Sequence, residues 1–187
     1  MRDGKTDLET RRARRRRFTR SRSDRAAALV EMALVAPVLV VLLFGMIEFG
    51  IGLNDYQSIR HGVREGARQA VVQQYGSAAT SCTSVSAPDE VKKVICLTKD
   101  RIGIGDDVAV FVRYYAPTDV DDESDHGAVL VCAQRNVDPV TGIVPGIDGI
   151  SLESSILMKM EKEIGEGIST AAPYQEAAPA GQDWSGC

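Results

Sequence analysis

Residues 25–50 read RAAALVEMALVAPVLVVLLFGMIEFG, and this stretch decides the fold. Including its weakly polar flanks, the apolar run covers positions 26–53, and only Glu31 and Glu48 interrupt it with a charge. A helix needs roughly 20 apolar residues to cross a bilayer. The stretch therefore predicts a transmembrane helix over residues 26–53.

Charged residues are distributed unevenly on the two sides of this run. Residues 1–25 contain 11 basic and 4 acidic side chains, net +7, whereas residues 54–187 contain 11 basic and 20 acidic ones, net −9. With the two glutamates between them, the total is −4. Because arginine and lysine stay on the cytoplasmic side of a span, we expect a cytoplasmic N terminus and an extracytoplasmic chain after residue 54.

The arm at residues 1–25 is polar, highly charged and without periodicity, so we expect it to be disordered. Its arginine cluster is of a kind that binds nucleic acid. However, no nucleic-acid-binding fold and no interleaved aromatic residues accompany it, and membrane topology already accounts for the charges. We therefore expect no nucleic-acid partner.

A helical pattern continues beyond the span, within NDYQSIRHGVREGARQAVVQQYG at residues 54–76. Apolar residues recur there at helical spacing while the arginines take other faces, which predicts an extension over residues 54–74. A helix over residues 26–74 would be about 70 Å long, more than a membrane needs. Its outer half must therefore pack on its own domain or on neighbouring subunits. Pro37 is expected to bend the helix inside the membrane.

Gly62 and Gly66 give the helical extension a small-x-x-x-small face. Such a face lets another backbone come close. The backbone could belong to a partner subunit, which would make these glycines assembly residues, or to the domain of the same chain.

Residues 75–164 predict a small α+β domain with a short antiparallel sheet. DDVAVFVRYYAP (106–117) alternates Val108, Val110 and Val112 on one face, and AVLVCAQR (128–135) is a second strand. SLESSILMKMEKE (151–163) fits either a strand or a helix, and we predict a strand because the other two need a partner. A short helix or strand is expected near residues 91–97. The Ala-, Pro- and Gly-rich tail at 165–187 is expected to be disordered.

All four cysteines lie on the predicted extracytoplasmic side, where thiols tend to pair. They lack C-x-x-C spacing, which argues against zinc, and four cysteines permit three complete pairings. Cys82 with Cys96 is favoured because 13 intervening residues close a loop at low entropy cost. Cys132 is the third disulfide candidate in the folded part, and Cys187 ends the tail.

No catalytic or cofactor-binding motif is present in the sequence. The two histidines, His61 and His126, lack a Cys/His/carboxylate cluster, and the acidic DVDDESD at 119–125 lacks the spacing of an EF-hand loop. There is no G-x-S-x-G, P-loop or H-E-x-x-H. We therefore expect a non-enzyme with no catalytic residues, metal or cofactor.

The segment ALVEMALVAPVLVVLLFGMIEFG, followed by REGARQA, resembles the TadE-like proteins, the minor pilin or pseudopilin class of tight-adherence (Flp-type) pilus systems. The resemblance covers roughly residues 22–72, and the outer strands match only in general plan. It implies a pilin-like membrane precursor that takes part in building or operating a pilus. The implied partners are membrane lipid, other pilin or pseudopilin subunits and assembly-platform proteins.

The resemblance also implies a role for the first glutamate. In pilin-like precursors a prepilin peptidase cuts after a small residue, commonly Gly, and leaves the glutamate fifth in the mature chain. Counting back from Glu31 places the cut between Ala26 and Ala27, with Ala26 in the place of Gly. The new amine at Ala27 would be a cationic partner for Glu31 of an adjacent subunit. Without such a partner, a carboxylate in lipid has a high insertion free energy.

Glu48 is predicted to lie near the outer membrane interface, about 25 Å from Glu31 along a straight helix. Water or headgroups would reach it there, and Arg60 or Arg64 of a neighbouring helix could face it. The alternative reading of both glutamates is that they bracket the hydrocarbon and snorkel to its edges. The chain would then be a single-pass envelope-anchored binding protein unrelated to pili.

Overall fold

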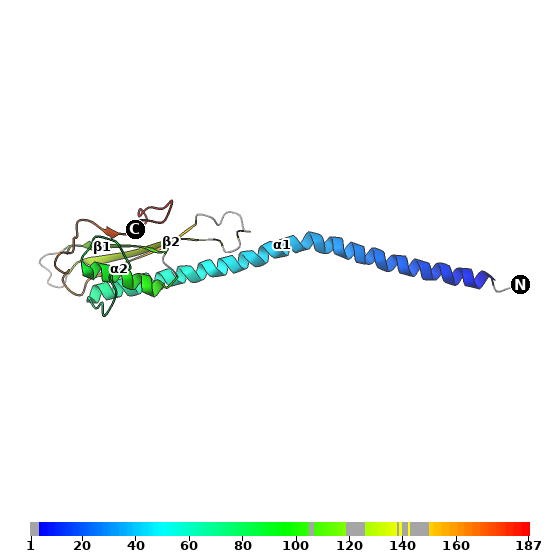
Figure 1. The fold of residues 1–187 in the computed structure, drawn as a ribbon, viewed down its shortest axis with the longest axis horizontal. Helices are drawn as coiled ribbons and strands as arrows, with labels where there is room; N and C mark the ends of the chain where they lie inside the picture. The colour runs from blue at the N-terminus through cyan, green and yellow to red at the C-terminus, as the bar shows by residue number, and fades with distance from the viewer. Residues whose placement is uncertain (1–3, 105–106, 119–125, 138, 140–141, 143–149) are drawn as a thin grey trace. The chain divides into compact units, whose positions relative to one another are not determined.

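The computed structural model describes residues 4–104, 107–118, 126–137, 139, 142 and 150–187, with side chains from Arg25 onward (Figure 1). It divides into two compact units, Met1–Ile47 and Glu48–Cys187. The elements in chain order are α1 (Gly4–Val72), α2 (Asp89–Ile102), β1 (Ala109–Tyr115), β2 (Ala128–Asn136), β3 (Ser151–Lys159) and β4 (Tyr174–Gln175).

Helix α1 begins at Gly4, which differs from the irregular arm expected for residues 1–25. Residues 5–25 contain neither Gly nor Pro. Once a helix has nucleated, each further residue adds a hydrogen bond without a new nucleation step, so the apolar helix can extend backward through the arm. The other end of α1, at Val72, lies two residues before the expected boundary.

The first unit contains most of the apolar run. Within the described part of the chain, the Arg25–Val72 segment of α1 is long and apolar enough to cross a membrane, and its most apolar stretch is not buried by the protein. This segment fits a single-pass membrane protein. The helix continues through Pro37.

The second unit contains a four-stranded antiparallel sheet in the order β3-β2-β1-β4. β1 and β2 pair over their length, from Ala109 opposite Gln134 to Tyr115 opposite Ala128, and β3 continues the sheet on the far side of β2. The predicted α+β class with a long N-terminal helix and an antiparallel sheet is confirmed. Residues 151–159 form the predicted strand.

One face of the sheet, together with the outer half of α1 and with α2, encloses the main hydrophobic core. The alternation expected for β1 places Val110, Val112 and the preceding Val108 on this face. Apolar residues at helical spacing on α1 form the opposite wall. The core residues are Ile59, Val63, Ala67, Ala70 and Val71 of α1, Val91, Val94, Ile95 and Ile102 of α2, Val108, Val110, Val112, Tyr114, Val129, Val131 and Ala133 around the two central strands, and Met160.

The segment around residues 91–97 lies in a 14-residue helix, α2. Its ends carry the expected charges for a helix dipole, with Asp89 and Glu90 in the first turn and Lys99 and Arg101 in the last. Gly103 ends the helix in a left-handed conformation with φ of 64°, and its N–H donates to the carbonyl of Lys99.

The opposite face of the sheet has a smaller core made of Phe111, Leu130 and Cys132. Trp184 packs against it, with its ring centroid 5.4 Å from that of Phe111, and Cys187 is bonded to Cys132. The expectation of a disordered tail at residues 165–187 is therefore wrong. The tail's composition is that of a disordered segment, but its aromatic ring and last cysteine bind a sheet face that would otherwise contact water.

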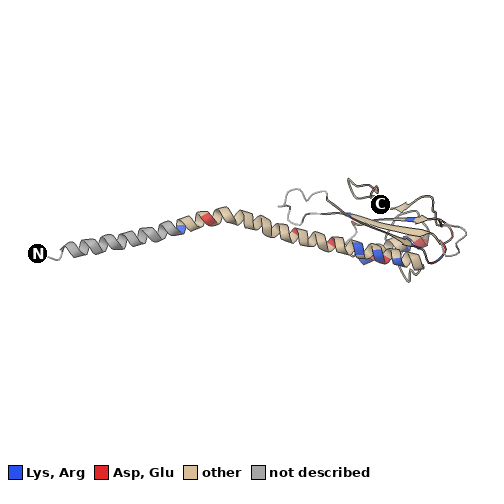
Figure 2. Ribbon diagram, turned by 180° about the vertical axis from the view of Figure 1, so that it is seen from behind, with Lys and Arg blue, Asp and Glu red and all other residues tan. Residues whose placement is uncertain are grey.

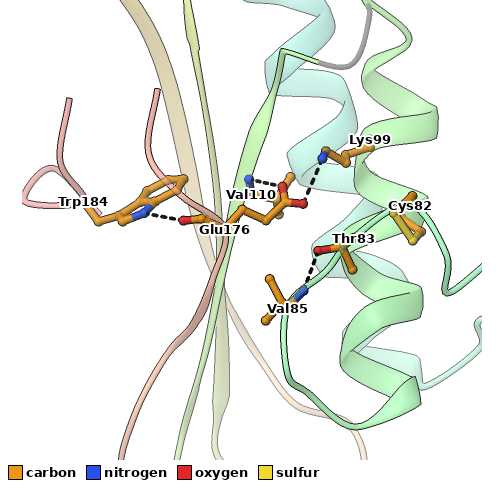
Figure 3. Close-up of polar contacts among 8 residues, drawn as sticks. Cys82, Thr83, Val85, Lys99, Val110, Glu176 and Trp184 are labelled. Atoms are coloured by element: carbon orange, nitrogen blue, oxygen red, sulfur yellow. Dashed lines mark hydrogen bonds and ion pairs between the residues drawn. A yellow bond between two sulfur atoms is a disulfide. The ribbon is translucent and has the colours of Figure 1, made fainter. Parts of the chain in front are cut away.

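Glu176 directly follows β4 and anchors the tail along the outer edge of β1 (Figure 3). Its backbone N–H donates to the Val110 carbonyl at 3.1 Å, and one carboxylate oxygen accepts the Val110 N–H at 3.0 Å. The other oxygen accepts from Lys99 of α2 at 2.9 Å, and the Glu176 carbonyl accepts from Trp184. One residue thus links the tail to the sheet and to α2.

Candidate assembly interface

The surface of α1 in the apolar run consists of exposed hydrophobic side chains. In aqueous solution such an exposed apolar area would be unfavourable, whereas a bilayer or neighbouring helices would accommodate it. The exposed residues from this run are Leu29, Val30, Met32, Leu34, Val35, Val38, Leu39, Val40, Val41, Leu42, Leu43, Met46, Ile47, Phe49, Ile51 and Leu53.

Glu31 is exposed near the start of this apolar surface, between Val30 and Met32. The residues three and four positions away on either side, which share its face of the helix, are Ala27, Ala28, Leu34 and Val35. Among the described side chains, no cation lies within ion-pair distance of Glu31. A carboxylate in this position needs a partner from outside its own helix once lipid surrounds it.

Ala26 and Ala27 are exposed on α1 about one turn before Glu31. The position expected for peptidase cleavage therefore lies on the exposed surface of α1 in the first unit.

Pro37 is exposed on α1, six residues after Glu31. Because proline has no N–H, the carbonyl of Ala33 loses its usual acceptor role within the helix. In lipid such a carbonyl needs another donor. The first unit therefore presents two polar groups, a carboxylate and a backbone carbonyl, near the start of its apolar surface.

Glu48 is more enclosed by its own chain than the sequence predicted. Its side chain is 6% exposed and already takes part in an interaction within the chain. Water and headgroups were expected to reach this carboxylate, and an arginine of a neighbouring helix was a candidate partner. The burial of Glu48 in the second unit removes it from the exposed surface available for such contacts.

The two glycines of the small-x-x-x-small face contact α2 of the same chain. A Cβ added at Gly62 would lie 2.8 Å from the Ile102 nitrogen and 2.9 Å from the Thr98 carbonyl oxygen, and one added at Gly66 would collide with the Thr98 hydroxyl. Of the two readings left open by the sequence, the structure supports packing within the domain. The close approach of α1 and α2 takes up the space that a partner helix would need.

Two disulfides crosslink the second unit. Cys82 is bonded to Cys96, the pairing favoured by loop length, and Cys132 to Cys187. The described residues include one group of three potential metal ligands, namely Cys132, Glu153 and Cys187. Its two sulfur atoms are joined to each other, so they are not available as thiolates.

Sequence reasoning missed three residues that fix the tail, which are Glu176, Trp184 and Cys187. The only signal for them was an aromatic residue and a cysteine in an otherwise low-complexity tail. Neither residue indicates by itself which part of the domain it would contact.

Comparison with known proteins was informative for the helix. Residues 26–68 match the family model of TadE-like proteins. The resemblance drawn from the sequence motifs is confirmed for this segment, which includes Glu31, Pro37, Glu48 and both glycines of the α1–α2 contact. Neither the comparison with curated proteins nor that with solved structures gives a match.

The TadE-like segment ends at residue 68 and therefore excludes the sheet and the tail. What the match characterises is the apolar part of α1 and the turns that follow it. TadE-like proteins are a pilus-associated structural family, and the likeness to them is confined to the helix.

Proposed function

We propose that this chain is a structural component of a tight-adherence (Tad) pilus or secretion apparatus, a minor pilin or pseudopilin that assembles through its apolar helix. The observation that carries the proposal is Glu31, a carboxylate exposed among apolar side chains within the segment that matches TadE-like proteins. The partners are other pilin or pseudopilin subunits and the assembly platform.

The membrane orientation follows from the charge distribution. The net +7 of residues 1–25 holds the N terminus in the cytoplasm, and the acidic second unit lies outside the cytoplasmic membrane. The oxidising environment there is compatible with both disulfides.

Glu31 acts as the assembly contact. Insertion scales place the cost of an ionised side chain at about 3 kcal/mol at the centre of a span, which is an upper value for Glu31 near the start of the apolar run. An isolated copy bears this cost, whereas a copy beside a cationic partner recovers much of it as an ion pair in a low-dielectric medium. Association is thereby favoured at one helical register.

A prepilin peptidase supplies the cation by cutting between Ala26 and Ala27. The cut removes the basic arm and leaves an ammonium group at Ala27 of the mature chain. Stacking of two apolar helices then brings the amine of one subunit to Glu31 of the next.

Substitution of Glu31 in the full-length chain, produced in a cell with the pilus machinery, tests the pairing. We expect Glu31→Ala and Glu31→Gln to insert into the membrane as well as the wild type, because both remove a charge from lipid. Both variants should fall at least about tenfold in cross-linking to pilus components, since loss of one buried ion-pair partner costs more than about 1.4 kcal/mol. Asp100→Asn, which removes an exposed carboxylate of α2, is the control.

Incorporation of both Glu31 variants at wild-type levels would refute the pairing mechanism. Mass spectrometry of the mature N terminus tests the processing step independently, with a species that begins at Ala27 as the expected result. An intact arm together with indifference to Glu31 would instead identify an envelope-anchored binding protein.

A further inference from the structure

Three arginines follow one another along the exposed side of the outer half of α1. Arg60, Arg64 and Arg68 are spaced one helical turn apart and are all exposed, and we call them the arginine stripe. Figure 2 shows these basic positions on α1 within the second unit. Like charges four residues apart destabilise a helix by about 0.2 to 0.5 kcal/mol per pair, so helix stability does not account for the stripe.

The arginine stripe has no anionic ion-pair partner in the described part of its own chain. No described carboxylate lies within ion-pair distance of the three guanidinium groups. The two nearby acids of α1 are engaged elsewhere, because Glu65 accepts from Gln69 at 2.8 Å and Asp55 binds Arg135 at 3.2 Å.

Lipid headgroups do not fit the length of the stripe. The apolar run ends at Leu53, and at 1.5 Å per residue Arg60 lies about 10 Å and Arg68 about 22 Å further along the helix. The headgroup layer of one leaflet is only about 5 to 7 Å thick. The binding partner of the whole stripe must therefore be a protein surface outside the membrane.

The rest of the second unit is acidic. Residues 73–187 contain 8 basic and 18 acidic side chains, net −10. Three exposed carboxylates, Glu161, Glu163 and Glu166, lie in the loop that follows β3, and we call residues 160–168 the acidic loop. This loop is held at the end of α1, where Glu161 N–H donates to the Val71 carbonyl and Gln73 donates to the Glu163 carbonyl.

We propose that the arginine stripe of one copy binds the acidic loop of a second copy. The stripe is centred on Arg64 and the loop lies at the level of Val71, seven residues away. The two copies are therefore displaced along their helices by about 10 Å. The stripe and the loop are different surfaces of one chain, so the contact is heterologous and can continue from copy to copy.

The length of the apolar run is consistent with this displacement. A helix over the 28 residues of positions 26–53 measures about 42 Å, whereas the hydrocarbon core is about 30 Å thick. The difference, about 12 Å, lets two copies shifted by about 10 Å both remain in the bilayer. This inference rests on the proposed membrane assembly and adds a contact outside the lipid.

Charge-reversal variants of the full-length chain, produced as two differently tagged populations, test the contact. Both populations are reconstituted together in vesicles of zwitterionic lipid, and co-isolation in mild detergent reports self-association. We expect R60E/R64E/R68E and E161R/E163R/E166R each to reduce co-isolation about tenfold when present alone, because three exposed ion pairs become repulsive. Mixing the two variants should restore it, and high salt should weaken the wild-type contact.

The control is K92E/K93E/R101E on α2, which changes the net charge by the same amount and should leave co-isolation unchanged. Restoration in the mixture also shows that both variants fold. Wild-type co-isolation of either stripe or loop variant, or failure of the mixture to recover, overturns the proposal. A stripe defect confined to vesicles that contain anionic lipid would assign the stripe to headgroups and also overturn it.

Glu31→Ala, cross-linked in a cell with the pilus machinery, where cleavage can supply the Ala27 amine, separates this contact from the proposed function. If Glu31→Ala associates normally while the charge exchange behaves as expected, the pairing inside the membrane fails and the stripe contact stands. If Glu31→Ala is defective and the charge-exchange variants associate as the wild type does, the pairing inside the membrane stands and the stripe contact fails.

Discussion

Tyr114 of β1, which is buried, and Tyr75, which follows α1 and is partly buried, have strongly shifted pKa values. Burial, assisted by the charge of Glu90, raises the pKa of Tyr75 to about 12. Burial also raises the pKa of Tyr114 well above its usual value of 10.0, and neighbouring Tyr75 and Glu90 add to the shift. Both hydroxyls are therefore protonated in the folded domain at any physiological pH.

The raised pKa values predict a loss of stability at alkaline pH. An acid whose folded pKa exceeds its unfolded pKa stabilises the fold fully below the unfolded value, near 10, and ceases to do so as the pH rises toward the folded value. Between about pH 9 and about pH 11 we expect the free energy of unfolding to fall by about 1 to 2 kcal/mol, since part of Tyr75 is exposed. Chemical denaturation followed by circular dichroism measures this.

Tyr114→Phe keeps the ring and removes one of the two hydroxyls, so the alkaline loss should be smaller in this variant. Tyr56→Phe removes an exposed hydroxyl on α1 and should leave the loss unchanged. Equal pH dependence of the wild type and Tyr114→Phe would contradict the assignment to buried tyrosine.

The two glutamates of the apolar run show how far a single residue can be interpreted from sequence. Both are carboxylates in an apolar helix, and the sequence treats them alike except for their distance from its ends. The structure leaves Glu31 exposed and buries Glu48 at 6% exposure. This difference depends on folding of the second unit around one glutamate only, which residue type and spacing do not encode.

At the scale of elements, periodicity was a good guide wherever one face of an element is buried. The alternation of Val108, Val110 and Val112 placed all three in the main core, and the helical spacing of Ile59 and Val63 did the same for α1. Residues 91–97 and 151–159 were ambiguous because their apolar patterns fit both periods. Charges at the ends of α2 and the pairing of β3 with β2 decide these two cases.

Contact between α1 and α2 at Gly66 leads to a stability prediction. In Gly66→Ala the added methyl group would meet the Thr98 hydroxyl, which is buried and donates to the Val94 carbonyl at 2.7 Å. Overpacking costs typically 1 to 3 kcal/mol and outweighs the gain of up to about 1 kcal/mol in helix propensity. We therefore expect a net loss of about 1 kcal/mol in denaturant unfolding of the full-length chain.

Gly52→Ala is the matched control, because nothing lies within 4 Å of the added Cβ on the same helix. It should be neutral or slightly stabilising. If Gly66→Ala instead weakens self-association without changing the free energy of unfolding, the glycine face contacts another subunit and the packing assignment is wrong.

At the scale of the whole molecule, the C-terminal tail completes the second unit. Trp184 and the Cys132–Cys187 disulfide cover the second face of the sheet, and Glu176 connects the tail to β1 and α2. The disulfide joins residues 55 positions apart, whereas Cys82–Cys96 joins residues 14 apart. By loop entropy the two bonds stabilise the fold by about 4 and about 3 kcal/mol respectively.

Removal of each disulfide in turn tests the role of the tail. Cys132→Ser with Cys187→Ser should lower the free energy of unfolding by about 4 kcal/mol. It should also make the tail more susceptible to carboxypeptidase, because only noncovalent contacts such as those of Trp184 and Glu176 then hold it. Cys82→Ser with Cys96→Ser removes the shorter crosslink and should leave the tail protected. Digestion of the tail at equal rates in both variants would contradict a role for Cys187 in holding it on the sheet.

By itself the sequence determined the long apolar helix, its likeness to TadE-like proteins, the α+β class and the strands with a buried face. These properties depend on local composition and period, which residues close in the chain carry. Tertiary structure alone decided the burial of Glu48, the use of Gly62 and Gly66 within the domain, and the return of Cys187 to Cys132. Each of these depends on contacts between residues far apart in sequence, whose selection requires the packed surfaces of both partners.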